Sequence, residues 1–394
     1  MWLMPSLIYN LYMKIHFLGI GGSGASAAAA IAQAQGYQVT GCDLDLRGHS
    51  PKHLKNIDIL AVTPAIYSLD PQNPELLEAK KMGIPVITWQ KFLGKYLTRD
   101  KFVIAVAGTH GKTTTTAMIG TLLENAGLDP TVELGAEVSK WKANFRVGKG
   151  KFFVCEADEY NDNFLNFKPD IAVVTNIEMD HPEYFKDFQA VKKSFDKFKN
   201  QSKKVIDQPN PKLINSLQIP GDFNILNASL TFQVGILLGI DPKIIEQSLK
   251  NYQGVGRRFE LLGQFKGAKI YSDFGHHPTE IKVTMEAARE KFPKQKIWLI
   301  YEPHMFTRTK ALFNDFVKVF REIPVDRIII TDIYQSREID KGLVTSKQLA
   351  DAAGKQYIAK NQLNDYLEKE LKENDVIFFM GAGDIDKMAK EFAG

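Results

Sequence analysis

The chain has 394 residues, of which 44% are hydrophobic and 24% charged, and this composition is typical of a globular enzyme with two or three domains. The formal charge is only +4 and the lysines are scattered along the chain, which argues against a nucleic-acid partner. No apolar run reaches transmembrane length, so we expect no membrane association. The two cysteines, Cys42 and Cys155, are too few for a disulfide framework, and we expect both to be small core residues in a reducing cytoplasm. The apolar opening, residues 1–12, lacks a basic signal-peptide region, and translation is expected to begin at Met1 or at Met13.

The first predicted domain, residues 1–99, opens with an apolar strand over 14–18 that leads directly into a glycine-rich loop and an alanine-rich helix. The loop matches the G-x-G-x-x-G fingerprint of dinucleotide-binding folds, in its required context between a strand and a helix. Asp43 follows the next predicted strand, 37–41, where such folds place an acid for a ribose hydroxyl. The pattern alone would suit NAD, but what it provides physically is a pyrophosphate site that any nucleotide diphosphate can use.

The second predicted domain, residues 100–254, contains a strand over 102–107, a second glycine loop and a helix. In this loop Lys112 supplies a full positive charge, the hydroxyl of Thr113 can ligate Mg²⁺, and backbone N–H groups converge on phosphate oxygens. We interpret the loop as an ATP phosphate site, although only two residues separate its glycines where the common P-loop has four. The alternative is a glycine turn that merely precedes a helix. The residues expected around ATP phosphates are Gly108, Thr109, His110, Gly111, Lys112, Thr113 and Thr114.

Acidic residues follow two further predicted strands of this domain, at 151–155 and 171–175. The first strand runs into the sequence EADE, which begins at Glu156, and the second leads to Asp180 and His181. Carboxylates are the hard oxygen ligands that Mg²⁺ prefers, and a doubly wound sheet gathers its ligands at the carboxyl ends of its strands. We therefore favour a magnesium site at this edge over the alternative, which is a set of solvated loop residues.

The third predicted domain, residues 255–394, repeats the alternation of strands and helices. His276 and His277 follow its first strand, and without a cysteine or another histidine at ligand spacing they indicate a substrate cleft rather than a zinc site. Asn224 and Asn227 open a helix shortly before this domain and could either read an adenine edge or cap the helix. The elements expected in the third domain include a strand over 265–271 and helices over 278–291, 309–321 and 361–372.

Eight motifs in the same order, AVAGTHGKTTT, EADE, TNIEMDH, NILNA, GVGRRFE, DFGHHPTEI, PHMFTRT and GAGDI, resemble those of the Mur ligases of peptidoglycan synthesis. The resemblance implies an α/β fold with three domains, namely a Rossmann-like N-terminal domain, a P-loop central ATPase domain and a Rossmann-like C-terminal domain. It implies ATP-dependent amide ligation through an acyl phosphate, with Mg²⁺ as cofactor, in a cytoplasmic monomer or homodimer. The motifs, including LGIGGSG, are most similar to those of members that join L-alanine to UDP-N-acetylmuramate, so ATP and these two compounds are the expected partners.

The resemblance also implies roles for individual residues. Catalytic roles fall to Lys112, Glu156, His181 and His277, and the metal would be bound by Thr113, Glu156 and His181. ATP would be held by the second glycine loop with Asn224, Asn227, Arg257 and Arg258. The residues expected to bind the UDP-sugar are Gly19, Gly21, Gly22, Ser23, Gly24 and Asp43. The amino acid would contact His276 and Arg308.

Two departures from the family pattern bear on specificity. The segment 203–222 is shorter than is usual, and Met305 stands where the alanine ligases commonly carry an arginine. A ligase that attaches a recycled tripeptide to UDP-N-acetylmuramate therefore stays open as an alternative. From other classes, an NAD-dependent oxidoreductase would leave the second glycine loop unused, and a non-catalytic nucleotide-binding homologue would bind ATP without forming an amide.

Overall fold

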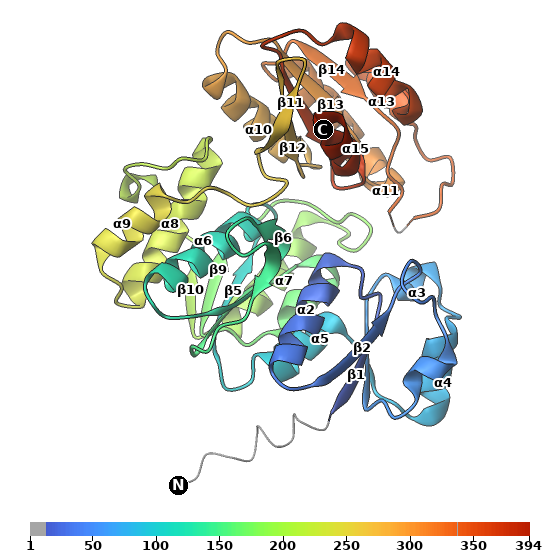
Figure 1. Ribbon diagram of the computed structural model, residues 1–394, viewed down its shortest axis with the longest axis vertical. Coiled ribbons are helices and arrows are strands. Elements are labelled where there is room, and N and C mark those ends of the chain that lie inside the picture. Colours follow the sequence, from blue (N-terminus) through green and yellow to red (C-terminus); the bar gives the residue numbers. More distant parts are fainter. Residues whose placement is uncertain (1–12, 337) are drawn as a thin grey trace. The chain divides into compact units, whose positions relative to one another are not determined.

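The computed structural model describes residues 13–336 and 338–394, so the expectation for the opening residues 1–12 lies outside the described part. The described chain is α/β, as predicted, and forms three sheets (Figure 1). It divides into two compact units, and the first unit contains the first two sheets. The second unit contains the third sheet together with Met179–Phe188 and Pro211–Ala228. Each unit is described by itself below.

The first sheet is parallel, with strand order β2-β1-β3-β4. Its strands are β1 (Lys14–Leu18), β2 (Gln38–Cys42), β3 (Ile59–Val62) and β4 (Val86–Thr88). Its helices are α2 (Ser23–Ala34), η1 (Pro51–Leu54), α3 (Ile66–Leu69), α4 (Pro74–Met82), α5 (Trp89–Phe92) and η2 (Leu93–Leu97). Helix α4 begins where the side chain of Asn73 accepts a hydrogen bond from the Glu75 N–H, and it ends at Gly83 in the left-handed conformation.

The second sheet has the order β10-β9-β5-β8-β6-β7 and is parallel except for the β6–β7 pair. Its strands are β5 (Phe102–Ala107), β6 (Thr131–Val138), β7 (Ala143–Arg146), β8 (Phe152–Glu156), β9 (Ile171–Val174) and β10 (Lys204–Ile206). The helices of this part of the chain are α6 (Lys112–Asn125), η3 (Tyr160–Asn166), α7 (Phe188–Asn200), η4 (Pro211–Leu213), α8 (Asp222–Leu237) and α9 (Pro242–Lys250). The predicted strand 102–107 is confirmed as β5, and its apolar residues are buried because β5 lies between β9 and β8.

The third sheet has the order β11-β12-β16-β13-β14-β15, in which only the β11–β12 pair is antiparallel. Its strands are β11 (Glu260–Phe265), β12 (Ala268–Asp273), β13 (Ile297–Tyr301), β14 (Arg327–Ile330), β15 (Gln356–Tyr357) and β16 (Val376–Met380). Its helices are α10 (Pro278–Lys291), α11 (Phe306–Ala311), α12 (Phe313–Glu322), α13 (Ser346–Ala353), α14 (Lys360–Glu370) and α15 (Ile385–Ala393). Residues of α10, α12 and α13 share one apolar core against the sheet, and residues of α14 and α15 share the other, so helices cover both faces.

Two predictions for this third sheet were wrong. The expected single strand over 265–271 is a hairpin, because Lys266 and Gly267 both adopt positive φ and turn the chain. The expected helix over 309–321 is two helices, α11 and α12, which meet at Leu312 outside helical geometry.

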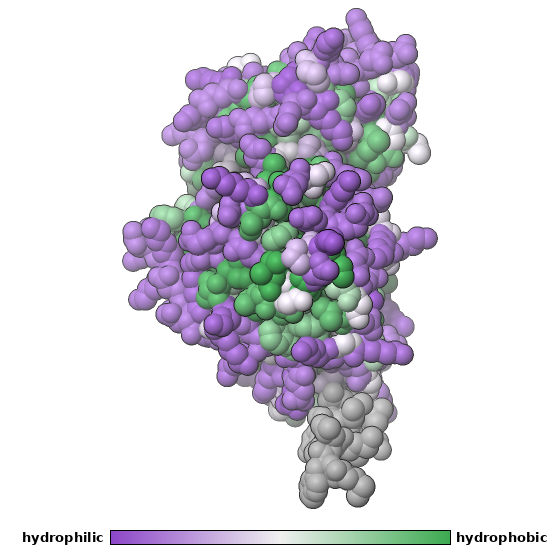
Figure 2. All heavy atoms as spheres, turned by 90° about the vertical axis from the view of Figure 1, so that its left-hand side faces the viewer, coloured by the Kyte–Doolittle hydropathy of each residue, from purple (hydrophilic) through white to green (hydrophobic). Residues whose placement is uncertain are grey.

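The surface of the first unit exposes a few large apolar side chains. Figure 2 shows hydrophobic residues gathered among hydrophilic ones on the side that carries α8 and α9. The large apolar residues that these helices leave exposed there include Ile236, Leu237 and Ile244. Within residues 13–336 and 338–394, no helix combines the length and the apolar character needed to span a membrane.

Candidate active site

The glycine loop that follows β5 can be built only with glycine at two positions. Gly108 and Gly111 have φ of 139° and 82°, and a Cβ on Gly108 would lie 2.0 Å from Thr175 Oγ1. Helix α6 begins directly after Gly111, which makes no side-chain capping hydrogen bond. A helix N-terminus that follows a glycine loop is a natural site for phosphate oxygens.

Lys112 lies at the start of α6 and turns back over this loop. Its Nζ donates to Glu159 Oε2 at 3.0 Å and to the carbonyl oxygens of Gly108 and Thr109 at 2.6 and 3.3 Å. Burial would lower the pKa of the Lys112 ammonium, but the carboxylates of Glu159, Asp158 and Glu156 raise it above the usual value. The lysine is therefore charged, and it bridges the loop and the residues that follow β8.

The segment after β9 holds the glycine loop from its other side. The Asn176 side chain accepts from the His110 N–H and donates to the His110 carbonyl, each at 2.9 Å. The Glu178 N–H donates to Thr109 Oγ1 at 2.8 Å, and His110 Nε2 lies 3.5 Å from the Glu178 carboxylate. Sequence analysis did not single out Asn176, Glu178 or Glu159, although all three fall within the TNIEMDH and EADE motifs at strand ends.

Two buried carboxyl groups lie together beside β8. Glu156 Oε2 accepts from the Gly135 N–H at 3.0 Å. Burial and the nearby Glu156 raise the pKa of Glu133 well above its usual value, so Glu133 is protonated at neutral pH. The anionic member of the pair is then Glu156, on the same sheet edge as Lys112 and Thr113.

The first glycine loop is organised by β2. The Gly19 and Ile20 N–H groups donate to the carbonyl of Cys42 at 2.9 and 3.2 Å, and Gly21 N–H donates to Asp43 Oδ2 at 2.9 Å. Asp43 thus bonds its own loop. A Cβ on Gly24 would lie 2.4 Å from the Trp89 ring, which requires glycine at this position.

In the second unit, Arg308 is almost completely buried and pairs with Asp180. Its Nε and Nη2 lie 3.1 and 3.0 Å from Asp180 Oδ1, and its Nη1 lies 3.1 Å from His304 Nδ1. Burial would raise the pKa of Asp180, but Arg308 and His181 hold it far below its usual range. His181 Nδ1 lies 3.4 Å from Arg308 Nη2 and 3.3 Å from Glu183 Oε1, so this histidine belongs to the same ionic group.

The paired histidines lie at the start of α10. His277 Nδ1 accepts from the Thr279 N–H at 3.3 Å, and Glu280 Oε2 accepts from both the His276 and His277 N–H groups, which completes a capping box. Burial lowers the pKa of His276 to about 3, with Arg308 adding to the effect and Glu280 opposing it. His276 is therefore neutral at physiological pH.

The remaining predicted residues of the second unit lie in two places. Arg257 donates from Nη2 to the carbonyls of Gly381 and Gly383 at 2.8 and 3.0 Å, and Arg257 and Arg258 both lie over the Phe274 ring. Asn224 and Asn227 are buried near the start of α8, where Asn224 Nδ2 donates to the Pro220 carbonyl at 2.7 Å. These asparagines lie inside the helix and do not cap it, because α8 begins at Asp222.

The structure brings together the predicted site residues within each unit. The first unit contains Gly19, Gly21, Gly22, Ser23, Gly24, Asp43, Gly108, Thr109, His110, Gly111, Lys112, Thr113, Thr114 and Glu156. The second unit contains His181, Asn224, Asn227, Arg257, Arg258, His276, His277 and Arg308.

A phosphate-binding loop on a parallel sheet, with carboxylates at the neighbouring strand ends and two further nucleotide-type α/β sheets, defines an ATP-using α/β enzyme. Family models described as Mur ligase family, catalytic domain; Mur ligase middle domain; and Mur ligase, glutamate ligase domain match residues 14–101, 106–211 and 257–383. The chain belongs to the Mur ligase family and is an ATP-dependent ligase.

Named relatives match the chain over nearly all of its length. The UDP-N-acetylmuramate–L-alanine ligase of Alkaliphilus metalliredigens is 34% identical and that of Clostridium tetani 35% identical, with 95% and 96% of this chain and 96% and 97% of theirs covered. The first alignment spans 447 residues, more than this chain has, so that relative contains segments that are absent here. Among solved structures, the UDP-N-acetylmuramate-alanine ligase of Thermotoga maritima gives a TM-score of 0.81 at 27% identity, with 96% of this chain and 98% of that chain covered.

Proposed function

We propose that the chain joins L-alanine to UDP-N-acetylmuramate at the expense of ATP, as a step of peptidoglycan precursor synthesis in the cytoplasm. The observation that carries this proposal is the 34–35% identity, over nearly the whole chain, to ligases that bear this name. The phosphate loop with its charged Lys112 supports the use of ATP. In this scheme the three sheets correspond to three domains, at residues 1–99 for the UDP-sugar, 100–254 for ATP and 255–394 for the amino acid.

The reaction balances in two steps. A carboxylate oxygen of the muramoyl group attacks the γ-phosphorus of ATP, so an acyl phosphate forms and ADP leaves. The L-alanine nitrogen then attacks the acyl carbon, the amide bond forms, phosphate leaves, and the nitrogen gives up a proton. Lys112 exchanges its contacts with Glu159 and the loop carbonyls for phosphate oxygens and stabilises the charge on the moving phosphoryl group.

A magnesium ion fits the chemistry of the donor set in the first unit. Thr113 offers a hydroxyl, and Glu156 offers a carboxylate that stays anionic beside the protonated Glu133. We propose these two residues, with His181, as the groups that hold the ion. Bound there, Mg²⁺ supplies further positive charge to the phosphate oxygens.

The amino-acid end of the site rests on Arg308 and His276. Asp180 and His304 fix the guanidinium of Arg308 in one orientation, and this fixed charge supports the proposed pairing with the L-alanine carboxylate. His276 is neutral and can donate or accept one hydrogen bond without adding charge. The proposed adenine contacts are Asn224 and Asn227, with Arg257 or Arg258 against the nucleotide.

Phosphate release by the purified chain tests the proposal directly. ATP and Mg²⁺ are supplied with UDP-N-acetylmuramate, with L-alanine, and with both, and the product mass is measured in parallel. Release only with both substrates, together with the mass of UDP-muramoyl-alanine, is the expected result. Release with a tripeptide but not with L-alanine would replace the amine in the proposal and direct attention to Met305, and ATP binding without any amide product would refute the ligase proposal.

A further inference from the structure

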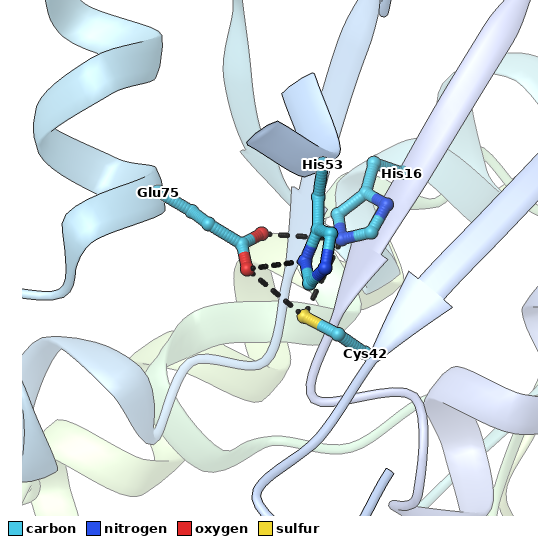
Figure 3. A group of neighbouring side chains, drawn as sticks. All are labelled: His16, Cys42, His53 and Glu75. Atoms are coloured by element: carbon cyan, nitrogen blue, oxygen red, sulfur yellow. Dashed lines mark hydrogen bonds and ion pairs between the residues drawn. The ribbon is translucent and has the colours of Figure 1, made fainter. Parts of the chain in front are cut away.

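Four side chains with metal-binding atoms converge beside the first sheet, away from the glycine loops. They come from four different elements, namely His16 on β1, Cys42 on β2, His53 on η1 and Glu75 on α4. Figure 3 shows the four side chains pointing toward one another, and their ligand atoms all lie within 4.8 Å. Neither the family resemblance nor the proposed reaction assigns a role to any of them.

The distances within this cluster are those of neighbouring ligands around one ion. His16 Nε2 lies 3.4 Å from Cys42 Sγ and 3.1 Å from Glu75 Oε2. Glu75 Oε1 lies 3.1 Å from Cys42 Sγ and 3.0 Å from His53 Nδ1. A tetrahedral zinc centre has bonds of about 2.0–2.3 Å, which separates neighbouring ligand atoms by about 3.3–3.8 Å. The four donors need to move outward by only a few tenths of an ångström to surround an ion.

The charge of Glu75 points to a missing cation. The side chain is 0% exposed. Burial would raise its pKa, but hydrogen bonds from His16, the Ser50 N–H and Cys42 lower it to about 2, so a full negative charge is buried. Among the described residues, its ion-pair partners are histidines only, with no lysine or arginine. An unpaired buried carboxylate is expensive, and a divalent cation would neutralise it together with a Cys42 thiolate.

Groups outside the cluster already orient its ligands. His16 Nδ1 lies 2.8 Å from Thr40 Oγ1, and the tautomer that donates this bond leaves the lone pair of Nε2 directed at the cluster. The Ser50 N–H donates to Glu75 Oε1 at 2.9 Å and fixes the carboxylate. His49 Nδ1 lies 3.3 Å from Cys42 Sγ, so a further imidazole stands beside the four. Oriented second partners of this kind are characteristic of protein metal sites.

We propose that His16, Cys42, His53 and Glu75 bind one divalent cation of the zinc class. Two imidazoles, one thiolate and one carboxylate are donors that zinc accepts, and the donor set differs from the oxygen-rich site that suits magnesium. On binding, the Cys42 thiol gives its proton to solvent and the sulfur forms a bond to the metal. The site is structural, since burial of all four donors leaves no open position for a substrate.

The site would also connect to the first glycine loop. The same Cys42 that supplies the sulfur accepts the Gly19 and Ile20 N–H groups with its backbone carbonyl. Metal binding would therefore fix the end of β2 on which that loop is built. The metal proposal itself is independent of the proposed ligase reaction, because its readout is metal content.

The test uses the full chain, purified without a metal-affinity step and then loaded with Zn²⁺ or Co²⁺ and dialysed. We expect about one tightly held Zn²⁺ per chain by elemental analysis. Co²⁺ should give the intense visible bands of a tetrahedral centre and a near-ultraviolet thiolate charge-transfer band. Cys42→Ser should abolish the charge-transfer band, whereas the matched control Cys155→Ser, which removes the buried cysteine of β8, should retain it.

A second variant guards against misfolding. His53 is 24% exposed, so His53→Gln should fold, as judged by circular dichroism, and should lower zinc affinity at least about tenfold. Removal of Zn²⁺ by a chelator should lower the thermal midpoint of the wild-type chain and leave that of Cys42→Ser unchanged. Absence of stoichiometric zinc, or a cobalt spectrum that Cys42→Ser does not alter, would overturn the proposal and leave a hydrogen-bonded network in which a proton takes the place of the ion.

Discussion

At the scale of single residues, the candidate site is dominated by charges that the fold holds in place. Lys112 is held by Glu159 and two loop carbonyls, and Arg308 by Asp180 and His304. Each cation is pre-oriented, so little side-chain entropy remains to be lost when an anionic substrate group arrives. Their partners within the chain are therefore part of the site.

Replacement of Lys112 by alanine tests the phosphate loop. We expect Lys112→Ala to lower kcat by at least about 100-fold, because it removes the positive charge nearest the phosphates. The circular dichroism spectrum should stay that of the wild type. Lys140→Ala is the matched control, since this exposed lysine of the same unit pairs only with Glu124 and Asn125. Normal ligation by Lys112→Ala would remove the basis for the ATP site.

Glu302 predicts a pH dependence of stability. Burial raises the pKa of Glu302 to about 7, with Asp384 adding to this effect and Lys360 opposing it. The unfolded carboxyl has a pKa of about 4.3, so the folded chain binds the proton more tightly. The contribution is fully present below about pH 4.3 and is lost as the pH rises to about 7, with a slope of at most about 1.4 kcal/mol per pH unit. Urea unfolding at a series of pH values should show this fall in wild type, and Glu302→Gln should remove it; an equal fall in the variant would contradict the assignment.

At the scale of elements, the start of α10 assigns His277 a structural part. Loss of its capping bond in His277→Ala should lower the free energy of unfolding by about 1 kcal/mol. His277→Asn should restore most of that stability, because asparagine is a good N-cap. Denaturant unfolding measures the first effect and ligation the second. If His277→Asn is as stable as wild type yet inactive, His277 acts in catalysis as well as in capping; full activity would limit it to the cap.

The glycine loop after β5 gives a second prediction at this scale. Gly108→Ala would bring a Cβ within 2.0 Å of Thr175 Oγ1 at a φ that alanine avoids, so we expect a loss of about 1–3 kcal/mol in unfolding free energy and of ATP affinity. Gly127→Ala is the control, because it also has positive φ but meets open space. A smaller loss in Gly108→Ala than in this control would show that the close approach to Thr175 is unimportant.

At the scale of the whole molecule, much of the fold follows from the sequence. Apolar runs such as 102–107 predict buried parallel strands because both faces of the sheet are covered, and glycine loops mark where those strands end. The hairpin at Gly267 was missed because one polar-apolar run contains both of its strands. The pairing of Arg308 with Asp180 and the convergence of His16 with Glu75 join residues far apart in the sequence, and no local pattern reveals such contacts.

Coupling between substrates is a property of the complete chain. The residues proposed for ATP lie in both units, and those proposed for the amino acid lie in the second. Because the site is complete only when both units contribute, we predict that ATP alone is hydrolysed at least about tenfold more slowly than ATP is consumed with both other substrates present. Phosphate release under the two conditions measures the ratio. Equal rates would mean that the phosphate loop acts without the amino-acid end.

The contact between Lys112 and Glu159 also has a consequence for selectivity. Without nucleotide, the loop carries its own counter-ion, so an incoming anion must outcompete a carboxylate already held at 3.0 Å. A ligand with a single phosphate offers little more charge than the carboxylate that it displaces. A triphosphate offers several times more and can also occupy the α6 N-terminus. The loop thus sets a threshold of ligand charge, and it rejects weak anions before any contact with a base or a sugar is made.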